Sequence, residues 1–359
     1  MMTDLRVTLD RAELAYTTGD VEAGMQGANE VLAALDSHPE ASADAGVGLR
    51  RDARRLRAAA LETGGEFRQA ITVLEQLADE PMPDAAWLRG LIALSRCRRE
   101  IGDFDGASRV LDDARDTIER LGVDHLTEAV QLTVTVGSAH TSRGDLVRAR
   151  IIAKKALADA DRHDTVLGRA SALWNLAIIE SLEGRHPEAV TYLNQAVVAF
   201  EEGEDSRNLP RVRGTLALTL LDLDPPDVDR ALREFEQTER ELAWLPTNPV
   251  DLARYELGRA RAYLLVDRID KAADAISRCA ALTPREAGPI QVWVKAFKGR
   301  LEATRGDAQA AEVSYQEATA QAMDLGTPRS AAQLWLELGG LLDELGHADA
   351  AKDASPARR

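Results

Sequence analysis

Apolar residues recur along this chain at the three- and four-residue spacing of amphipathic helices. Leu173, Leu176 and Ala177 form one such stripe, and Leu193 and Val197 belong to the next. This spacing places the apolar side chains on one helical face, so both segments are predicted to be helices that pack against neighbours. Clusters of proline and polar residues separate similar segments throughout the sequence. The pattern predicts about seventeen full helices and a shortened last one.

A two-residue corner interrupts the helical pattern nine times, at intervals of 37 to 46 residues. In most corners the first residue is glycine, which adopts the left-handed conformation that ends a helix, and an acidic second residue favours the start of the next helix. The corners therefore predict a repeating unit of two helices. They are Gly19-Asp20, Gly65-Glu66, Gly102-Asp103, Gly144-Asp145, Gly184-Arg185, Pro226-Asp227, Asp267-Arg268, Gly306-Asp307 and Gly346-His347.

Small residues stand at two constant distances from these corners. Two helices that cross closely need small side chains where their backbones approach, so both positions are predicted to mark the crossings within each unit. Five residues after the corners stand Gly24, Ala70, Ala107, Ala149, Ala189, Ala231, Ala272, Ala311 and Ala351. Seven residues before them stand Ala12, Ala58, Ser95, Gly137, Ala177, Thr219, Ala260, Gly299 and Gly339.

These offsets resemble those of the tetratricopeptide repeat. The segment 173–197 matches best, with the sequence LWNLAIIESLEGRHPEAVTYLNQAV, and the resemblance extends over the whole chain. The units are nearer 40 residues than the usual 34, so their helices are expected to be longer. The resemblance implies an all-α, right-handed superhelical solenoid of about nine helix pairs. We expect one such domain over residues 1–359, with a last unit, 328–359, that is shortened or caps the array.

The composition agrees with a helical array and restricts its partners. The formal net charge is −16, from 44 basic and 60 acidic residues, which disfavours contact with nucleic acids and anionic lipids. The two cysteines, Cys97 and Cys279, are too far apart in sequence to indicate a disulfide framework or metal clip. The sequence has no signal-peptide pattern and no apolar stretch long enough to span a membrane, so we expect a cytoplasmic protein.

Three segments also resemble the repeat region of actinobacterial helix-turn-helix regulators: 170–190, 205–232 and 251–265. In that family a DNA-binding domain precedes a solenoid that senses a ligand. This chain begins at the first predicted solenoid helix, and the resemblance therefore implies a sensing or regulatory role without direct DNA binding.

No catalytic or metal-binding pattern emerges from the sequence. The six histidines fall mostly in connections and helix ends, and only His140 lies well inside a first helix, where packing or capping is its ordinary role. The chain has no HExxH, GxGxxG, GxxxxGK[ST] or GxSxG motif. We therefore expect neither an enzyme nor a cofactor.

The candidate binding residues are those that a tetratricopeptide superhelix would present on its concave wall, which is formed chiefly by the first helix of each pair. Arginine recurs at these positions and supplies a planar fork for carboxylates. Asn175 lies in the middle of a predicted helix, where its amide could hydrogen-bond a peptide backbone. Ordinary roles compete with these, since arginine also pairs with glutamate between helices and tryptophan also fills cores. The candidates are Arg96, Gln131, Trp174, Asn175, Arg213, Arg254, Arg261, Trp293 and Arg300.

The leading hypothesis is a regulatory or adaptor solenoid that binds an acidic or C-terminal segment of a protein or peptide in this groove. The alternative is the ligand-sensing part of a transcriptional regulator, which would bind a signal peptide or metabolite. A third interpretation is self-assembly into a homodimer through the end units.

Overall fold

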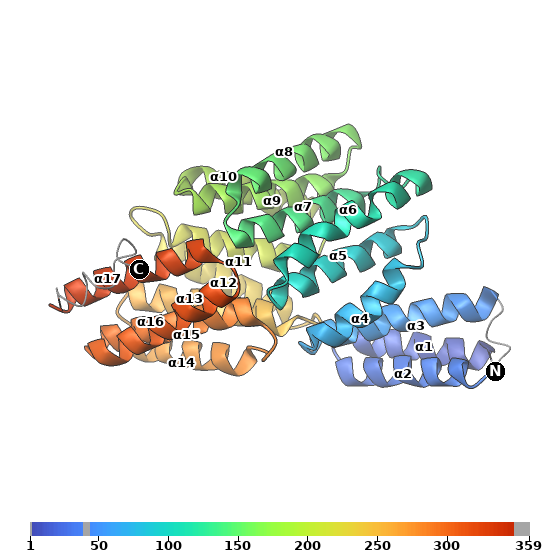
Figure 1. The fold of residues 1–359 in the computed structure, drawn as a ribbon, viewed down its shortest axis with the longest axis horizontal. Helices are drawn as coiled ribbons and strands as arrows, with labels where there is room; N and C mark the ends of the chain where they lie inside the picture. Colours follow the sequence, from blue (N-terminus) through green and yellow to red (C-terminus); the bar gives the residue numbers. More distant parts are fainter. Residues whose placement is uncertain (1, 39–43, 348–359) are drawn as a thin grey trace.

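A computed structural model describes residues 2–38 and 44–347, and within these ranges the chain is all-helical (Figure 1). This confirms the predicted all-α solenoid of paired helices. The seventeen helices are α1 (Met2–Thr17), α2 (Val21–Asp36), α3 (Asp44–Thr63), α4 (Phe67–Ala78), α5 (Ala85–Glu100), α6 (Phe104–Leu121), α7 (Thr127–Arg143), α8 (Leu146–Arg162), α9 (Val166–Leu182), α10 (His186–Glu202), α11 (Leu209–Leu220), α12 (Val228–Leu242), α13 (Pro249–Leu265), α14 (Ile269–Leu282), α15 (Gly288–Thr304), α16 (Ala308–Asp324) and α17 (Pro328–Glu344). The shortened last helix and Ala351 lie outside the described residues.

The first eight predicted corners join the two helices of each pair, and the ninth, Gly346-His347, follows α17 at the end of the described residues. All seven corner glycines have a positive φ, between 77° and 96°, which only glycine adopts without strain. At the corner without glycine between α13 and α14, Asp267 takes the same left-handed conformation with a φ of 56°. The glycine spacing therefore reports where each first helix ends.

Aspartates after the corners cap the second helices. The Asp103 carboxylate accepts a hydrogen bond of 2.8 Å from the amide of Gly106, and Asp20, Asp145, Asp227 and Asp307 make the equivalent bond. Glu66 stands at the same place in its unit but makes no such bond.

The Asp103→Ala variant is expected to be less stable than the wild type by about 1 kcal/mol, because one amide of the first turn of α6 loses its acceptor. Urea unfolding followed by circular dichroism measures this difference. Glu66→Ala is the matched control and should have a smaller effect; equal losses at both positions would contradict the capping role.

The small residues meet at the helix crossings, as predicted. The Ser95 hydroxyl on α5 donates a hydrogen bond of 2.9 Å to the carbonyl oxygen of Ala107 on α6. A Cβ atom added to Gly299 on α15 would lie 3.1 Å from the carbonyl oxygen of Ala311 on α16. In both pairs one residue precedes the corner by seven positions and the other follows it by five.

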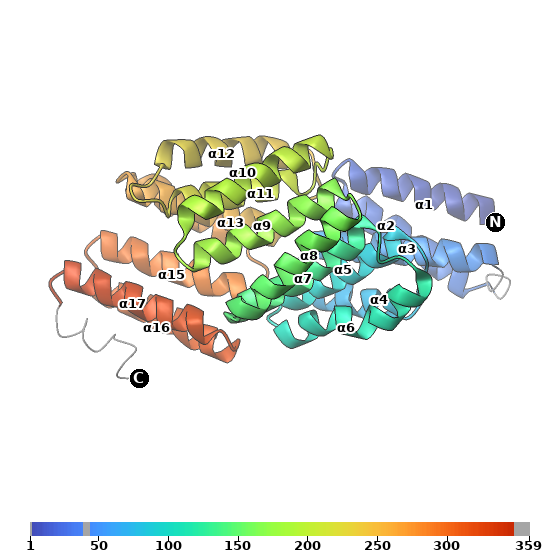
Figure 2. The same ribbon diagram turned by 90° about the horizontal axis from the view of Figure 1, so that it is seen from above.

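The superhelix winds so that its late units touch its early ones, although α1 and α17 lie at opposite ends of the molecule (Figures 1 and 2). The Glu286 carboxylate accepts a 2.9 Å hydrogen bond from the amide of Arg68, at the start of α4. The Arg329 guanidinium on α17 donates a 2.6 Å bond to the carbonyl oxygen of Leu182 on α9. These contacts join units that are far apart in the sequence. Within the described residues, no helix is both long and apolar enough to cross a membrane.

Candidate functional site

A cavity of about 900 Å³ occupies the concave side of the superhelix. Its walls come mainly from α3, α5, α7, α9, α11 and α13, which are the first helices of six successive pairs. The size falls in the range of pockets that hold small molecules or short peptide segments. The inner wall of the solenoid is therefore the candidate binding site.

Five of the predicted residues line this cavity. Arg96, Gln131, Trp174, Asn175 and Arg254 are contributed by α5, α7, α9 and α13. Counting back from the corners therefore finds inner-wall residues in several consecutive units. A contact between these residues and a ligand stays a prediction.

The other four predicted residues lie away from the cavity lining. Arg213 points between helices, where its guanidinium forms ion pairs with Glu201, Glu234 and Glu241. A helix exposes only part of its circumference to the cavity, and side chains at the edge of that arc meet neighbouring helices instead. Arg213 therefore forms ion pairs between helices, which was the alternative to ligand binding for the arginines.

Arg261, Arg300 and Trp293 are likewise engaged within the protein. Arg261 pairs with Asp222, and Arg300 pairs with Glu337 at 2.7 Å. Trp293 packs against buried residues of α15–α17 and of the early units. For these residues too, ligand binding stays a prediction.

One side of the cavity is a polar wall made by α7 and α9. The Ser138 hydroxyl donates a 2.7 Å hydrogen bond to the amide oxygen of Asn175. The amide nitrogen of Asn175 donates a 3.0 Å bond to the carbonyl oxygen of Ser171, and Gln131 reaches the Ser171 hydroxyl at 3.5 Å. The Asn175 amide retains one N–H and one lone pair for a ligand, because each group has a second bonding site.

Trp174 lies beside this polar wall in a fixed orientation. Its indole N–H donates a 2.9 Å hydrogen bond to the Thr215 hydroxyl, and its ring meets Phe200 edge to face at 6.2 Å. The Arg211 guanidinium lies 6.0 Å from the ring centroid, within cation–π range. These contacts preorganise an aromatic surface next to a cation.

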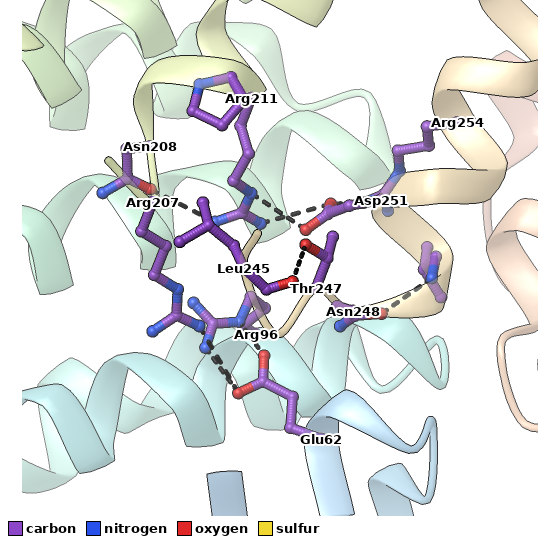
Figure 3. Close-up of polar contacts among 12 residues, drawn as sticks. Glu62, Arg96, Arg207, Asn208, Arg211, Leu245, Thr247, Asn248, Asp251 and Arg254 are labelled. Carbon is purple, nitrogen blue, oxygen red and sulfur yellow. Dashed lines mark hydrogen bonds and ion pairs between the residues drawn. The ribbon is translucent and has the colours of Figure 1, made fainter. Parts of the chain in front are cut away.

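Another part of the cavity lining carries a dense set of charges, which we call the arginine cluster. Figure 3 shows part of it: Arg96 and Arg207 reach Glu62, while Arg211 reaches Asp251. The cluster joins α3 and α5 to the segment before α11 and to α13. Its members are Arg96, Arg99, Arg207, Arg211, Arg254, Glu62, Glu100 and Asp251.

Glu62 and Arg96 form the most enclosed pair of the cluster. Their side chains are only 7% and 9% exposed, and they share two hydrogen bonds, one of 2.7 Å between Nη2 and Oε2. Burial alone would raise the pKa of Glu62, but the charges of Arg96 and Arg207 outweigh it and lower the pKa. Glu62 is therefore ionised at neutral pH.

Glu100 and Asp251 bridge distant parts of the chain. Glu100 accepts a 2.8 Å bond from Arg254 and a 3.0 Å bond from Arg99. Asp251 pairs with Arg211 at 3.1 Å and with Arg254 at 3.1 Å. Burial would raise the pKa of both carboxyls, yet their arginine partners lower it, so both are ionised. Through them α5 is tied to α13 and α13 to α11.

Arg207 is the most accessible cation of the cluster. Its side chain is 64% exposed, and its only carboxylate contact within the described residues is Glu62 at 3.8 Å. Arg207 lines the cavity, so water reaches its side chain although protein surrounds it. Repulsion by Arg96, followed by desolvation, lowers the pKa of Arg207. The guanidinium still stays protonated near neutral pH.

Only Arg96 and Arg254 of the cluster were predicted from the sequence. Arg207 belongs to the connection between α10 and α11, outside the helical positions that the repeat predicts to face inward. Glu62 and Glu100 could have been found only from their position, since each lies on the last turn of a first helix, a few residues before a corner. Such residues are ordinarily solvated, so that signal alone is weak.

These features define an all-helical solenoid of the tetratricopeptide type with a positively charged inner cavity. No protein-family model matches the chain, and no curated protein matches it. Among solved structures the chain is similar to a Rap conjugation gene regulator of the plasmid pLS20 in complex with the Phr* peptide. The identity is 15%, the match covers 91% of this chain and 97% of that one, and the TM-score is 0.61.

Two further structures show the same fold. A Rap protein complexed with Competence and Sporulation Factor is 12% identical over 97% of this chain and 100% of that one, with a TM-score of 0.56. Aspartyl phosphate phosphatase F from Bacillus subtilis is 11% identical over 98% of this chain and 91% of that one, with a TM-score of 0.54. At these identities the likeness concerns the fold.

Proposed function

We propose that this chain is a regulatory solenoid that binds a short peptide in its central cavity. The observation that carries the proposal is the cavity of about 900 Å³, whose lining combines hydrogen-bonding side chains with arginines. An extended peptide has backbone donors and acceptors that need partners when it leaves water. Ser138, Gln131 and Asn175 supply hydroxyl and amide groups for this purpose.

The charge of the cavity favours an acidic or C-terminal segment as the ligand. Seven arginines and four carboxylate residues line it, whereas the whole chain has a formal charge of −16. A positive concave surface on an acidic protein attracts anionic ligands and repels nonspecific cationic ones. Guanidinium groups also match the geometry of a carboxylate.

The structural comparisons support a peptide ligand. One similar structure holds the Phr* peptide and another holds Competence and Sporulation Factor, and both are Rap proteins. The shared fold supplies the same concave geometry here. The similarity to aspartyl phosphate phosphatase F raises the question of catalysis. The proposal is binding, because the arginines and hydroxyl groups of the lining suit a peptide and the Glu62 and Asp251 carboxylates are engaged in ion pairs.

Two finer features belong to the same proposal. A role like that of the sensing solenoid in actinobacterial regulators would place this chain upstream of a transcriptional response, and the peptide would then act as its signal. We further propose that the protein works in the cytoplasm. Reporter assays with the native operon and fractionation of native cells test these two statements separately from peptide binding.

The experiment is capture from a library of short random peptides by the purified protein, followed by affinity measurement on a captured peptide. Replacing Asn175 with alanine removes a side chain at the centre of the polar wall, and binding is expected to weaken roughly tenfold through the loss of one or two hydrogen bonds.

Asn194→Ala is the matched control, because Asn194 lies on an outer helix and bonds Arg230 instead of lining the cavity. Its peptide affinity should equal that of the wild type. Failure of the wild-type protein to retain any peptide would refute the proposed function, and equal losses in the two variants would refute the assignment of the polar wall.

A further inference from the structure

The charges of the arginine cluster do not balance. Five guanidinium groups surround three carboxylates, which leaves an excess of two positive charges on the cavity wall. Each carboxylate is already shared between two arginines, so none is free to neutralise the remainder. Uncompensated charge is costly in a partly desolvated site unless a counterion enters it.

Other charged groups of the lining have their own partners. Arg89 pairs with Glu128 at 3.5 Å, and Arg55 pairs with Asp84 at 3.7 Å. The Asp205 carboxylate accepts bonds from the backbone amides of Arg207 and Asn208 at the start of α11. Asp205 is thus engaged by the backbone at the start of α11, where a carboxylate stabilises the positive end of the helix. The excess of two positive charges therefore belongs to the arginine cluster.

We propose that the arginine cluster is a subsite for two negative charges carried on one end of the ligand. This inference rests on the proposed function and specifies its ligand: a peptide whose C-terminal residue is Asp or Glu, so that its α-carboxylate and side-chain carboxylate enter together. Arg207 is the residue that contacts this end most directly, because its side chain is 64% exposed and its Glu62 contact is long at 3.8 Å. Arg211 and Arg254 line the same cavity and belong to the same subsite.

The position of the subsite gives the peptide a direction. One cavity is lined by both the polar wall, with Asn175 and Ser138, and the arginine cluster. A bound peptide can therefore place its backbone on the polar wall and its C-terminal end on the arginine cluster. Trp174 and Arg211 are in cation–π contact where the two regions meet. A residue just before the C-terminus would therefore face an aromatic ring.

The first experiment uses N-acetyl-L-glutamate as the probe, because it reproduces the end of such a peptide. Calorimetric titration at constant ionic strength is expected to show binding. N-acetyl-L-glutamine, which lacks the side-chain charge, and N-acetyl-L-glutamate α-amide, which lacks the terminal charge, should each bind roughly tenfold more weakly or worse. Equal binding of the three compounds would overturn the two-charge subsite.

The second arm separates a carboxylate end from a free phosphoanion. Inorganic phosphate carries between one and two negative charges near neutral pH, and its geometry suits arginine as well. Phosphate binding weaker than that of N-acetyl-L-glutamate supports the peptide end. Tighter binding of phosphate would overturn it and would assign the cluster to a phosphoanion.

The variant that tests the residue is Arg207→Gln. It is expected to reduce N-acetyl-L-glutamate affinity at least about tenfold, while thermal stability stays the same or rises because the repulsion from Arg96 is relieved. Arg169→Gln is the control, since Arg169 is 59% exposed and pairs with Asp161 outside this cavity. Unchanged affinity in Arg207→Gln, or an equal loss in Arg169→Gln, would overturn the assignment.

The outcomes for the subsite and for the proposed function are distinguishable. Capture of peptides with amidated, uncharged C-terminal ends would refute the subsite and leave peptide binding intact. Binding of N-acetyl-L-glutamate together with failure to capture any peptide would support the subsite and refute peptide binding.

Discussion

Replacing Glu100 with glutamine is expected to lower the free energy of unfolding by about 3–5 kcal/mol, the usual cost of removing one partner of a buried ion pair. The Glu100 side chain is 2% exposed and accepts hydrogen bonds from Arg99 and Arg254. Glutamine has nearly the same shape but no charge, so Arg99 loses its carboxylate partner and Arg254 keeps only Asp251. The cluster then has five arginines against two carboxylates.

Urea unfolding followed by circular dichroism measures this loss. The matched control is Glu239→Gln, because Glu239 is 62% exposed and pairs with Arg259 at 3.0 Å on the outer surface. Exposed pairs contribute only about 0–1 kcal/mol, so the control should unfold nearly as the wild type does. A similar loss in both variants, or none in Glu100→Gln, would contradict the structural role of the cluster.

Removing a negative charge from the cluster and removing a positive one are expected to change stability differently. Because positive charge is in excess, loss of a carboxylate such as Glu100 increases the imbalance, whereas loss of Arg207 reduces it. Stability is therefore expected to fall in the first case and not in the second. A site that served only to hold helices together would lose stability in both.

The paired-helix fold could be predicted from the sequence because its determinants are local. Gly102 and Asp103 define a corner through their own backbone and side-chain preferences. Ser95 and Ala107 meet across that corner because they are only 12 residues apart. Interactions of this range repeat in every unit, so the spacing of small residues was enough to locate the helices and their crossings.

The candidate site could be predicted only in part, because it depends on how distant units meet. Arg254 contacts Glu100 although 154 residues separate them, and that contact follows from the winding of the whole superhelix. Small rotations at each repeat add up over several units, and no local pattern records their sum. Arg213 faces the neighbouring helices and pairs with Glu234 of its own unit, because only part of the circumference of α11 faces the cavity. Residues that share a position in the repeat thus acquire different surroundings.

The winding also explains why a cavity with this charge is compatible with an acidic chain. Glu62 and Glu100 lie on the early helices α3 and α5, while Arg207, Arg211 and Arg254 come from later units. Ion pairs between them hold the early and late units together on the inner surface. The arginines that remain in excess are then directed toward the enclosed space, where a ligand can reach them.

Stability is expected to fall steeply as the pH is lowered below about 5, because the cluster keeps its carboxylates ionised. The arginines lower the pKa values of Glu62, Glu100 and Asp251 below those of the unfolded chain. Between the unfolded and folded pKa values the unfolded state binds more protons, so acid favours unfolding. The stabilisation is complete above the unfolded pKa values and is lost as the pH falls through the folded ones.

The measurement is the free energy of unfolding in urea at a series of pH values from neutral to about 3, at constant ionic strength. Three carboxyls that each differ by one proton give a slope of at most about 4 kcal/mol per pH unit. Other carboxyls also titrate in this range, so the comparison with Glu100→Gln is decisive. That variant starts less stable, but its slope should be shallower by about 1 kcal/mol per pH unit, because one of the three protonations is absent. Parallel curves for the wild type and the variant would show that Glu100 is not held ionised by Arg99 and Arg254.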